Sequence, residues 1–361
     1  MGLSLVPEAE SAGKTAMSGT PLRVLHAPAE IAGQASVLAR ALRGLGVEAH
    51  SLAYNPGFPQ YQPDEMRPYD DQPPLERYLG YLASTLRNLG RWDVYHFHFG
   101  RTLIPPHNWD LPLYRSLGRT VVFHYHGCDI RDRAHMLATH ARATCSECDP
   151  FCHPARQRRI LASAARFADA ELVSTPDLLE SATGARHLPV ALDLADYPFA
   201  PPRGKPALVV HAPTNRLIKG TRYVEAAFAT LGPRFPGVRF EVVERKPWAE
   251  LRAILAQADA VVDQLFMGWY GMVAVEAMAL GKPVLCFVRD DFEPRLRGCP
   301  IVRCGREDLA ERLADVLSDA TDRATLGERG RAYAEREHAA PVVAGRLLEL
   351  YRSLAPGAAR A

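Results

Sequence analysis

Residues 263–285 contain glycines, a glutamate and a lysine in an order that could bind a phosphorylated nucleoside. A strand here is predicted to run into a glycine-containing loop, and a helix is predicted to begin at about Met272. A helix N-terminus preceded by glycine offers free N–H groups and a positive dipole, so a diphosphate can lie over Gly271, Met272 and Val273. Glu276, one turn further on, could accept hydrogen bonds from ribose hydroxyls. Taken alone, the segment also fits a generic unit whose glutamate faces solvent.

Lys219, followed by Gly220, stands just before a predicted helix at residues 221–231. A cation is disfavoured at a helix start, so an anion is expected beside Lys219. If that anion is a diphosphate leaving group, Lys219 and the nearby Arg216 would stabilise its growing charge. Loss of Lys219 is then expected to affect turnover more than folding.

Two further positions lie where parallel strands end. Gly33, at the start of the first predicted helix, could let phosphate oxygens or an acceptor approach the backbone, or could merely relieve a tight turn. His126 precedes Gly127 at the end of a strand, where an imidazole could hydrogen-bond a hydroxyl group across a cleft. His96 and His98 alternate along another strand and share one side, which predicts a polar lining or buried hydrogen bonds.

Three cysteines, Cys145, Cys148 and Cys152, fall within eight residues. Their spacing resembles half of a structural zinc site, and a fourth ligand could come from His153, Cys128 or His140. Incidental thiols on a surface loop are the other interpretation, because no second Cys-x-x-Cys pair is present.

Short apolar runs alternate with stretches of helical spacing in two series, which is typical of parallel sheets with crossover helices. In the first series, strands are predicted at residues 22–26, 47–53, 94–99, 121–125 and 170–174, with helices at 31–45, 75–89 and 156–167. Residues 55–74 contain six prolines and are predicted to be a long loop at one edge of the sheet. In the second series, strands are predicted at residues 207–211, 238–243, 260–263, 284–288 and 301–303. Helices are predicted there at residues 221–231, 248–257, 273–280 and 309–317, followed by 324–337 and 341–354.

A proline-rich run at residues 198–206 separates the two series. We therefore predict a disordered tail over residues 1–20, an N-terminal Rossmann-like domain over 21–198 and a C-terminal Rossmann-like domain over 199–340. Residues 341–361 are expected to cross back to the first domain as a helix and tail. The predicted fold class is α/β, with two doubly wound domains facing across a cleft that holds the ligand.

Composition excludes several classes of protein. The 361 residues are 47% hydrophobic and 23% charged, as expected for globular domains, and the net charge of +2 gives no field for nucleic-acid binding. No apolar run is long enough to cross a membrane, and residues 1–20 lack a secretory signal, so a cytoplasmic location is expected. Arginines at positions 156, 158, 159 and 166 form a basic face, which is usually solvated and less often rests on anionic lipid at a membrane surface.

Residues 276–284, Glu-Ala-Met-Ala-Leu-Gly-Lys-Pro-Val, resemble the donor-site signature of the retaining glycosyltransferase family four, also called group 1, which has the GT-B fold. The Lys219-Gly220 pair resembles the family's diphosphate-contacting lysine. Residues 124–129 and 188–194 resemble further family segments, so the resemblance extends over residues 21–354. In the family a first glutamate contacts the donor sugar, but Gly268 stands at that position here. The family's basic residue lies five positions before the lysine, where this chain has Thr214.

The resemblance implies a glycosyltransferase that moves a sugar, with retention, from a nucleotide diphosphate sugar to a glycan, lipid-linked or small-molecule acceptor. No metal or other cofactor is required for such a transfer. The replacement at Gly268 motivates an alternative, a degenerate GT-B protein that binds a nucleotide or a partner without turnover. A dinucleotide-dependent oxidoreductase is disfavoured, because no Gly-x-Gly-x-x-Gly follows any predicted strand.

Overall fold

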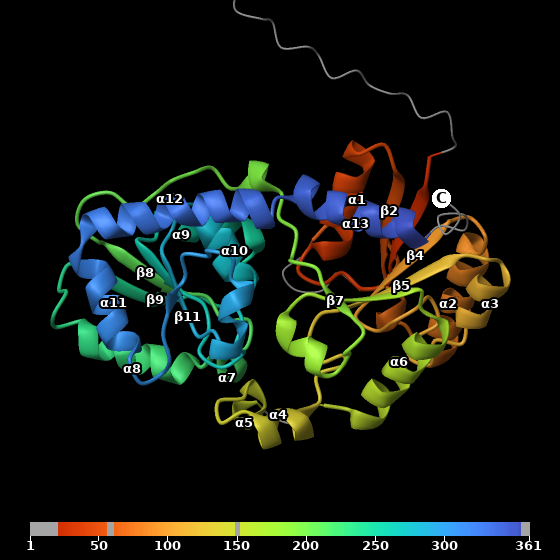
Figure 1. Cartoon of the computed structure of the whole chain (residues 1–361), viewed down its shortest axis with the longest axis horizontal. Helices are drawn as coiled ribbons and strands as arrows, with labels where there is room; N and C mark the ends of the chain where they lie inside the picture. The colour runs from red at the N-terminus through yellow and green to blue at the C-terminus, as the bar shows by residue number, and fades with distance from the viewer. Residues whose placement is uncertain (1–20, 56–60, 149–151, 355–361) are drawn as a thin grey trace, which may run out of the picture.

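The computed structural model describes residues 21–55, 61–148 and 152–354, which contain two parallel β-sheets flanked by helices (Figure 1). The first sheet has seven strands in the order β3-β2-β1-β4-β5-β6-β7. Its strands are β1 (Arg23–Ala27), β2 (Glu48–Ala53), β3 (Glu65–Met66), β4 (Val94–His98), β5 (Thr120–Tyr125), β6 (Ala170–Val173) and β7 (Arg186–His187). The second sheet has five strands in the order β12-β11-β10-β8-β9. Its strands are β8 (Leu208–His211), β9 (Arg239–Val242), β10 (Ala260–Val262), β11 (Val284–Cys286) and β12 (Val302–Arg303).

Helices connect the strands on both faces of each sheet. Those that follow strands of the first sheet are α1 (Gln34–Gly44), α2 (Pro74–Asn88), α3 (Leu111–Ser116), α4 (Arg133–Thr139), α5 (Thr144–Glu147) and α6 (Pro154–Phe167). Those associated with the second sheet are α7 (Arg216–Lys219), α8 (Thr221–Leu231), α9 (Trp248–Gln257), α10 (Met272–Ala279), α11 (Leu309–Ser318) and α12 (Ala320–Glu337). Short 3-10 turns occur at η1 (Tyr69–Asp71), η2 (Pro176–Glu180), η3 (Leu194–Asp196) and η4 (Asp290–Arg295).

The last helix, α13 (Ala340–Leu354), returns to the first sheet and packs against α1 (Figure 1). The contact buries apolar residues of both helices, including Leu38 and Leu347. The preceding helix α12 packs instead on α10 beside the second sheet. The chain therefore crosses between its two sheets twice, once after β7 and once between α12 and α13.

Each sheet has a position where the strand order reverses, between β1 and β4 in the first and between β8 and β10 in the second. Ligands of doubly wound sheets bind at the carboxyl ends of the strands at such positions. The loops after β1, β8 and β10 carry the residues of the candidate site.

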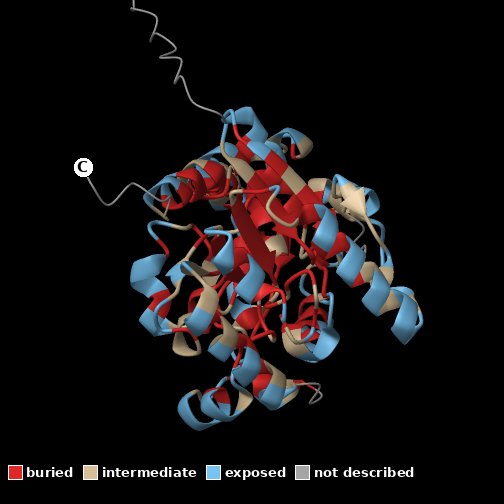
Figure 2. Cartoon of the chain, turned by 90° about the vertical axis from the view of Figure 1, so that its right-hand side faces the viewer, coloured by how far each residue is buried: buried red, intermediate tan, exposed pale blue. Residues whose placement is uncertain are grey.

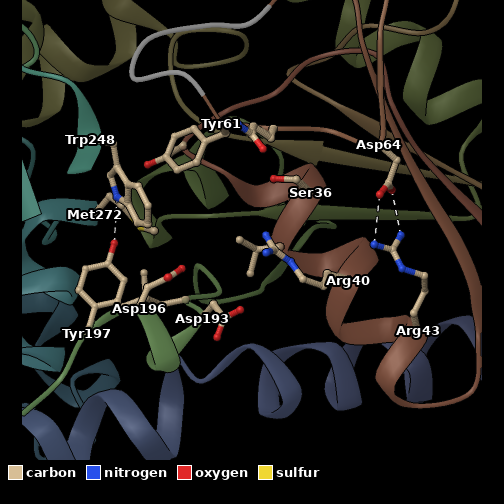
Figure 3. Close-up of a pocket in the computed structure, with 14 residues that line it drawn as sticks. Ser36, Arg40, Arg43, Tyr61, Asp64, Asp193, Asp196, Tyr197, Trp248 and Met272 are labelled. Carbon is tan, nitrogen blue, oxygen red and sulfur yellow. Dashed lines mark hydrogen bonds and ion pairs between the residues drawn. The ribbon is translucent and has the colours of Figure 1, made fainter.

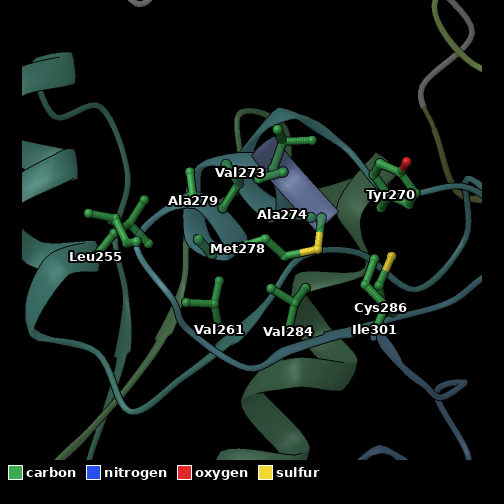
Figure 4. Close-up of a cluster of buried hydrophobic side chains, with 14 of the residues drawn as sticks. Leu255, Val261, Tyr270, Val273, Ala274, Met278, Ala279, Val284, Cys286 and Ile301 are labelled. Carbon is green, nitrogen blue, oxygen red and sulfur yellow. The ribbon is translucent and has the colours of Figure 1, made fainter. Parts of the chain in front are cut away.

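The interior separates into apolar clusters on the two faces of each sheet, and exposed residues lie mainly on the outer helices (Figure 2). One cluster packs α10 against the second sheet, where Ala274 and Met278 lie over Val261 and Val284 (Figure 4). Every residue of α10 after Met272 is buried. Within the described ranges, no helix is both long enough and apolar enough to cross a membrane.

The predicted elements differ from the observed ones mainly at their ends. The first helix begins at Gln34 because Gly33 has a φ of +77°, and β4 ends at His98 because Phe99 has a φ of +59°. The predicted loop at residues 55–74 contains strand β3 and turn η1. Helices α3, α4, α5 and α7 were not predicted, so Lys219 lies at the end of a short helix rather than at the start of one. The predicted tail at residues 1–20 lies outside the described residues.

Candidate functional site

A cavity of about 350 Å³ lies between the loops that follow the two sheets. The first sheet's loops contribute Glu30, Ile31, Ala32, Asn55 and Tyr61. The opposite wall consists of Ala212, Pro213, Thr214, Val243, Arg245, Lys246, Trp248, Leu251, Met272, Val273 and Glu276. An indole, two basic side chains and apolar residues of the second domain therefore lie on one side of a slot about the size of a nucleotide ligand, and Glu30, Asn55 and Tyr61 lie on the other.

Glu276 lies on the cavity wall although only 3% of its surface is exposed. Its Oε1 accepts hydrogen bonds from the Tyr197 hydroxyl at 2.8 Å and from the Trp248 indole N–H at 3.2 Å. Burial raises the pKa of Glu276 to about 7, and these two hydrogen bonds lower it in part. The predicted ribose acceptor is thus held in a fixed position, with its second oxygen not bonded to either group.

The N-terminus of α10 lies beside the same cavity, lined by Met272 and Val273. The backbone N–H of Gly271 is already occupied, because it donates to Asp263 Oδ2 at 2.5 Å. Of the three residues predicted to bind a diphosphate, Met272 and Val273 line the cavity. The N–H of the third, Gly271, is bonded to the carboxylate of Asp263 instead.

Lys219 ends the short helix α7, and its Nζ lies 2.7 Å from Asp263 Oδ1. Both side chains are almost fully buried. A Cβ atom on Gly271 would lie only 2.7 Å from Lys219 Nζ, so the ammonium lies directly against the start of α10. The anion expected beside Lys219 is therefore Asp263. The ion pair gives Lys219 a part in folding as well, because its removal would leave a buried carboxylate unpaired, and the expectation that its loss affects turnover more than folding stays a prediction.

Arg216 lies on the surface, away from this arrangement. Its guanidinium bonds Glu244 at 2.7 Å and Glu225 at 2.5 Å, and it is not among the residues that line the cavity. Thr214 does line the cavity. The basic groups at the cavity are Arg245 and Lys246, which the sequence interpretation missed; Arg245 has a φ of +55°, a strained conformation often found at functional sites.

Gly33 faces the ring of Tyr61. A Cβ atom at Gly33 would lie 2.8 Å from the Tyr61 ring, so an aromatic side chain of this protein occupies the space predicted for phosphate or acceptor. The start of α1 is also capped internally, because the Glu30 carboxylate accepts from the N–H groups of Ala35 at 3.2 Å and Ser36 at 3.0 Å. The structure thus favours the turn interpretation of Gly33 over anion binding.

Gly268 is in the left-handed region, with a φ of +74°, and Arg289 covers it. A Cβ atom there would lie 2.7 Å from Arg289 Cδ. The Arg289 guanidinium reaches Glu180 of the first domain at 2.6 Å, and Glu180 also bonds His140 at 2.8 Å. An ion pair between the two domains therefore lies next to Gly268.

A second cavity, of about 440 Å³, adjoins the first and shares Ala32, Tyr61, Trp248 and Met272 with it (Figure 3). The side toward α1 presents Ser36, Arg40 and Arg43, with Arg43 bonded to Asp64. Asp193, Asp196 and Tyr197, from the segment between the two sheets, line the opposite side. Polar groups of both charges thus surround an open space beside Glu276 and Trp248.

Five histidines are packed together beneath the carboxyl ends of β1, β4 and β5. They belong to a continuous chain of polar contacts whose members, in order, are His96, Tyr351, His26, His98, His126, Ser174 and His124. The six separations along it are 2.6, 3.5, 3.0, 3.0, 2.6 and 3.2 Å. We call this series of contacts the imidazole chain. It confirms the prediction that His96 and His98 make buried hydrogen bonds.

Burial keeps the rings of the imidazole chain neutral. It lowers the pKa of His26 to about 3 and holds the pKa values of the other four well below 6.5. Their nitrogens are close enough to suggest metal binding, but the rings of His26 and His96 stack 4.6 Å apart at 24°. Stacked rings direct their in-plane lone pairs side by side, whereas a metal needs lone pairs that converge. The geometry favours hydrogen bonding over coordination.

His126 uses both ring nitrogens within this chain, Nε2 toward His98 and Nδ1 toward Ser174. Its backbone N–H lies 3.2 Å from an Asp129 oxygen. It is not among the residues that line the two cavities. A hydrogen bond from His126 to a substrate hydroxyl therefore requires one of these contacts to break.

The cysteine cluster lies between β5 and α6. Burial raises the pKa of the Cys145 thiol to about 12, with Arg131 acting against it and the thiols of Cys148, Cys128 and Cys152 adding to it, so four sulfurs lie in one region. His140 bonds Glu180 and Arg289, and His153 is exposed, which leaves Cys128 as the better fourth ligand. Thiols are suitable ligands for structural zinc, but among the described residues no three of these sulfurs lie within 4.8 Å of one another, so zinc binding here stays a prediction.

Sequence comparison locates a family match in the second domain. Residues 234–333 match the profile of the family described as "Glycosyl transferases group 1". No curated protein sequence matches the chain.

Solved structures match over nearly the whole chain. A sucrose-phosphate synthase from Thermosynechococcus elongatus superposes with a TM-score of 0.64 at 17% identity, covering 93% of this chain and 99% of that one. A glycosyltransferase from Rickettsia africae ESF-5 gives a TM-score of 0.60 at 12% identity, covering 94% and 100%. A Listeria monocytogenes protein provisionally named a UDP-N-acetylglucosamine 2-epimerase gives 0.54 at 13% identity, covering 93% and 96%. The chain has the GT-B fold of two Rossmann-like domains, as the sequence predicts.

Proposed function

We propose that this protein is a glycosyltransferase that uses a nucleoside diphosphate sugar as its donor. The observation that supports this most directly is the position of Glu276, which the buried Tyr197 and the half-buried Trp248 hold at the wall of the interdomain cavity. The match of residues 234–333 to the group 1 glycosyltransferases includes this glutamate.

In this proposal the nucleoside lies in the 350 Å³ cavity. Its base rests against the apolar and aromatic surface of Val243, Trp248 and Leu251, and its ribose hydroxyls donate to Glu276. The diphosphate lies over the N–H groups at the start of α10, where the helix dipole favours negative charge. Arg245 and Lys246, at the mouth of the same cavity, add positive charge.

The reaction moves the glycosyl group from the diphosphate to an acceptor hydroxyl, and the departing oxygen gains negative charge. Fixed donors and cations that face this oxygen stabilise the transition state more than the ground state. Lys219 acts through Asp263 and Gly271, because its ammonium lies under the first turn of α10. The acceptor enters from the adjoining 440 Å³ cavity, and retention of configuration follows from the resemblance to family four.

One observation supports binding without transfer as a second candidate. Arg289 covers Gly268, at the position of the family's sugar-contacting glutamate, and is fixed there by Glu180. No carboxylate from position 268 is available to the donor sugar. A protein of this kind would bind the nucleotide and leave the glycosyl bond intact.

The test is a panel of UDP-, GDP-, ADP- and dTDP-sugars, scored first by thermal shift and then by release of labelled sugar. A donor that binds the folded state raises its stability by about 2.7 kcal/mol at a hundred times its dissociation constant. The proposal expects one class of donor to stabilise the protein and to be hydrolysed slowly without an acceptor. Stabilisation without any hydrolysis or transfer supports the binding-only candidate, and no stabilisation by any donor contradicts both.

A further inference from the structure

Helix α2 buries mainly polar residues and exposes its leucines, the reverse of the usual arrangement. Its buried residues are Tyr81, Ser84, Thr85 and Asn88, and the last two bond backbone carbonyls of their own helix. Its leucines face outward instead. A helix normally turns its apolar stripe toward the core, so these leucines do not serve the packing of the first domain.

The outward leucines are Leu75, Leu79, Leu82 and Leu86, with exposed fractions of 72%, 57%, 48% and 64%. Their spacing of four, three and four residues places them on one line along the helix, which we call the leucine stripe. Tyr78, 41% exposed, lies on the adjacent turn. Four large apolar side chains in an unbroken row exceed the single exposed residues that are normal on a protein surface.

The segment around α3 extends this apolar surface. Trp109, Leu113 and Leu117 are 68%, 42% and 46% exposed. Helices α2 and α3 cover the same face of the first sheet, since the Tyr95 hydroxyl donates to the Asn88 carbonyl of α2 while its ring centroid lies 4.2 Å from that of Tyr114 of α3. Eight of the thirteen large hydrophobic residues that are exposed in the described ranges therefore lie on α2 or beside α3.

The charge of these helices differs from that of the whole chain. Helices α2, α3 and α6 together contain seven arginines and one acidic residue, Glu76, whereas the chain as a whole has 43 basic and 41 acidic residues. Arg158, Arg159 and Arg166 of α6 are exposed. All three helices lie at one end of the molecule, at the right of Figure 1, and Figure 2 looks onto that end.

We propose that this end of the first domain docks on an anionic lipid bilayer, with the leucine stripe and Trp109 inserted among the lipids and the arginines of α6 against the headgroups. Apolar residues beside a surplus of basic ones are the combination that holds a protein in a membrane interface. A second copy of the chain fits less well, because two such surfaces would place their arginines face to face. The docking surface is separate from the interdomain cavity, so it can be tested whether or not the protein transfers sugar.

The experiment is flotation of the full chain with vesicles of pure phosphatidylcholine or of equal parts phosphatidylcholine and phosphatidylglycerol. The wild type is expected to float with the anionic vesicles only. The Leu79→Ser, Leu86→Ser double variant should lose about tenfold in partitioning, since less apolar surface enters the lipid. Leu137→Ser on α4, whose leucine is 43% exposed, is the matched control and should float as the wild type does.

A second arm separates insertion from charge. Arg158→Gln with Arg159→Gln should weaken binding and flatten its dependence on salt, and Trp109 fluorescence should be quenched by brominated lipids in the wild type. Equal binding to both vesicle types, full binding by the leucine variant, or a dimer that this variant dissociates would each overturn the proposal. Unchanged melting temperatures of the variants show that the exposed substitutions leave the fold intact.

Discussion

At the scale of single residues, the Asp263 carboxylate occupies the position beside Lys219 where a ligand anion was expected. Asp263 bonds both Lys219 and the Gly271 N–H, so it neutralises the ammonium and caps α10 at the same time. The positive charge of Lys219 is thus balanced before any ligand binds. Stability and ligand binding share one buried ion pair.

Replacing Lys219 with methionine should therefore lower the free energy of unfolding by about 3–5 kcal/mol, because Asp263 is left buried and unpaired. Adding Asp263→Asn removes that charge and should restore most of the stability. Both variants should bind the donor about 10- to 100-fold more weakly, if the ammonium supports the diphosphate. Urea unfolding and calorimetry measure the two effects. If the double variant is no more stable than the single one, the ion pair does not carry the stability of this region.

Glu276 should make donor binding depend on pH. Its pKa of about 7 in the free protein means that the carboxylate must lose a proton to accept both ribose hydroxyls, so affinity should rise about tenfold between about pH 6 and pH 8. Glu276→Gln should bind weakly with little pH dependence. Calorimetry with an intact nucleotide sugar is suitable, because its diphosphate has no ionisation in this range, and Glu311→Gln, at an exposed position on α11, is the control. Parallel profiles for wild type and Glu276→Gln would exclude the carboxylate from the site.

The residues of the site were predictable to different degrees. Glu276 and Met272 were predictable because helix position and glycine spacing are local properties. Asp263 stands at the end of a strand predicted from the sequence, where its polarity was a usable signal. The pairing of Asp263 with Lys219 joins residues 44 positions apart and depends on the order β10-β8, which local spacing does not determine. Tyr61 beside Gly33 depends in the same way on packing between distant segments.

At the scale of elements, the loop between β10 and α10 is shaped around Arg289. Gly268→Ala must place a Cβ atom at a φ of +74° and 2.7 Å from Arg289 Cδ. We expect a loss of about 2–4 kcal/mol in unfolding free energy, from backbone strain and overpacking together. Gly298→Ala is the matched control, since Gly298 has a φ of +79° with no atom within 4 Å of a Cβ, and it should lose only about 1–2 kcal/mol. If both variants lose the same free energy of unfolding, Arg289 does not fill the space that a Cβ atom at position 268 would need.

Most helices and strands could be predicted from the spacing of apolar residues along the sequence. The main strands of both sheets were predicted because parallel strands are short apolar runs between helical patterns. Helices α3, α4, α5 and α7 were missed because they have only six, seven, four and four residues, too few to show a period. Helix α2 was predicted as a helix, but the orientation of its faces was not evident, because its leucines point away from the core.

At the scale of the whole molecule, the protein should be labile in acid. Eight histidines have pKa values lowered by burial, the five of the imidazole chain and His187, His211 and His338. Below about pH 6.5 the unfolded chain protonates these rings while the folded protein does not, so stability falls as pH falls. Glu276, Asp129, Glu30 and Asp110, whose pKa values are raised, act in the opposite direction.

Because eight histidines outnumber these four carboxyls, the unfolded chain binds more protons than the folded protein near pH 5.5, and we expect the free energy of unfolding to fall there as pH falls. Urea midpoints measured at pH values from about 7.5 to 5 give this slope directly. His107→Gln, which replaces a histidine outside this group of eight, should leave the slope unchanged, whereas His98→Gln should reduce it. A midpoint that stays constant over this range would mean that the buried rings are protonated in the folded state.

The number of hydrogen atoms in the imidazole chain limits how its hydrogen bonds can be oriented. Its seven members each carry one transferable hydrogen when neutral, and the six contacts between them hold six. The seventh must lie at an end, on His96 Nε2 or His124 Nδ1, and these are two buried nitrogens without a hydrogen-bond partner in the described structure. Only two arrangements exist, in which all six bonds point the same way. The hydrogen bonds of the imidazole chain therefore share one direction between β4 and β5, through Tyr351 of the C-terminal helix. Reversing that direction requires seven hydrogens to move together.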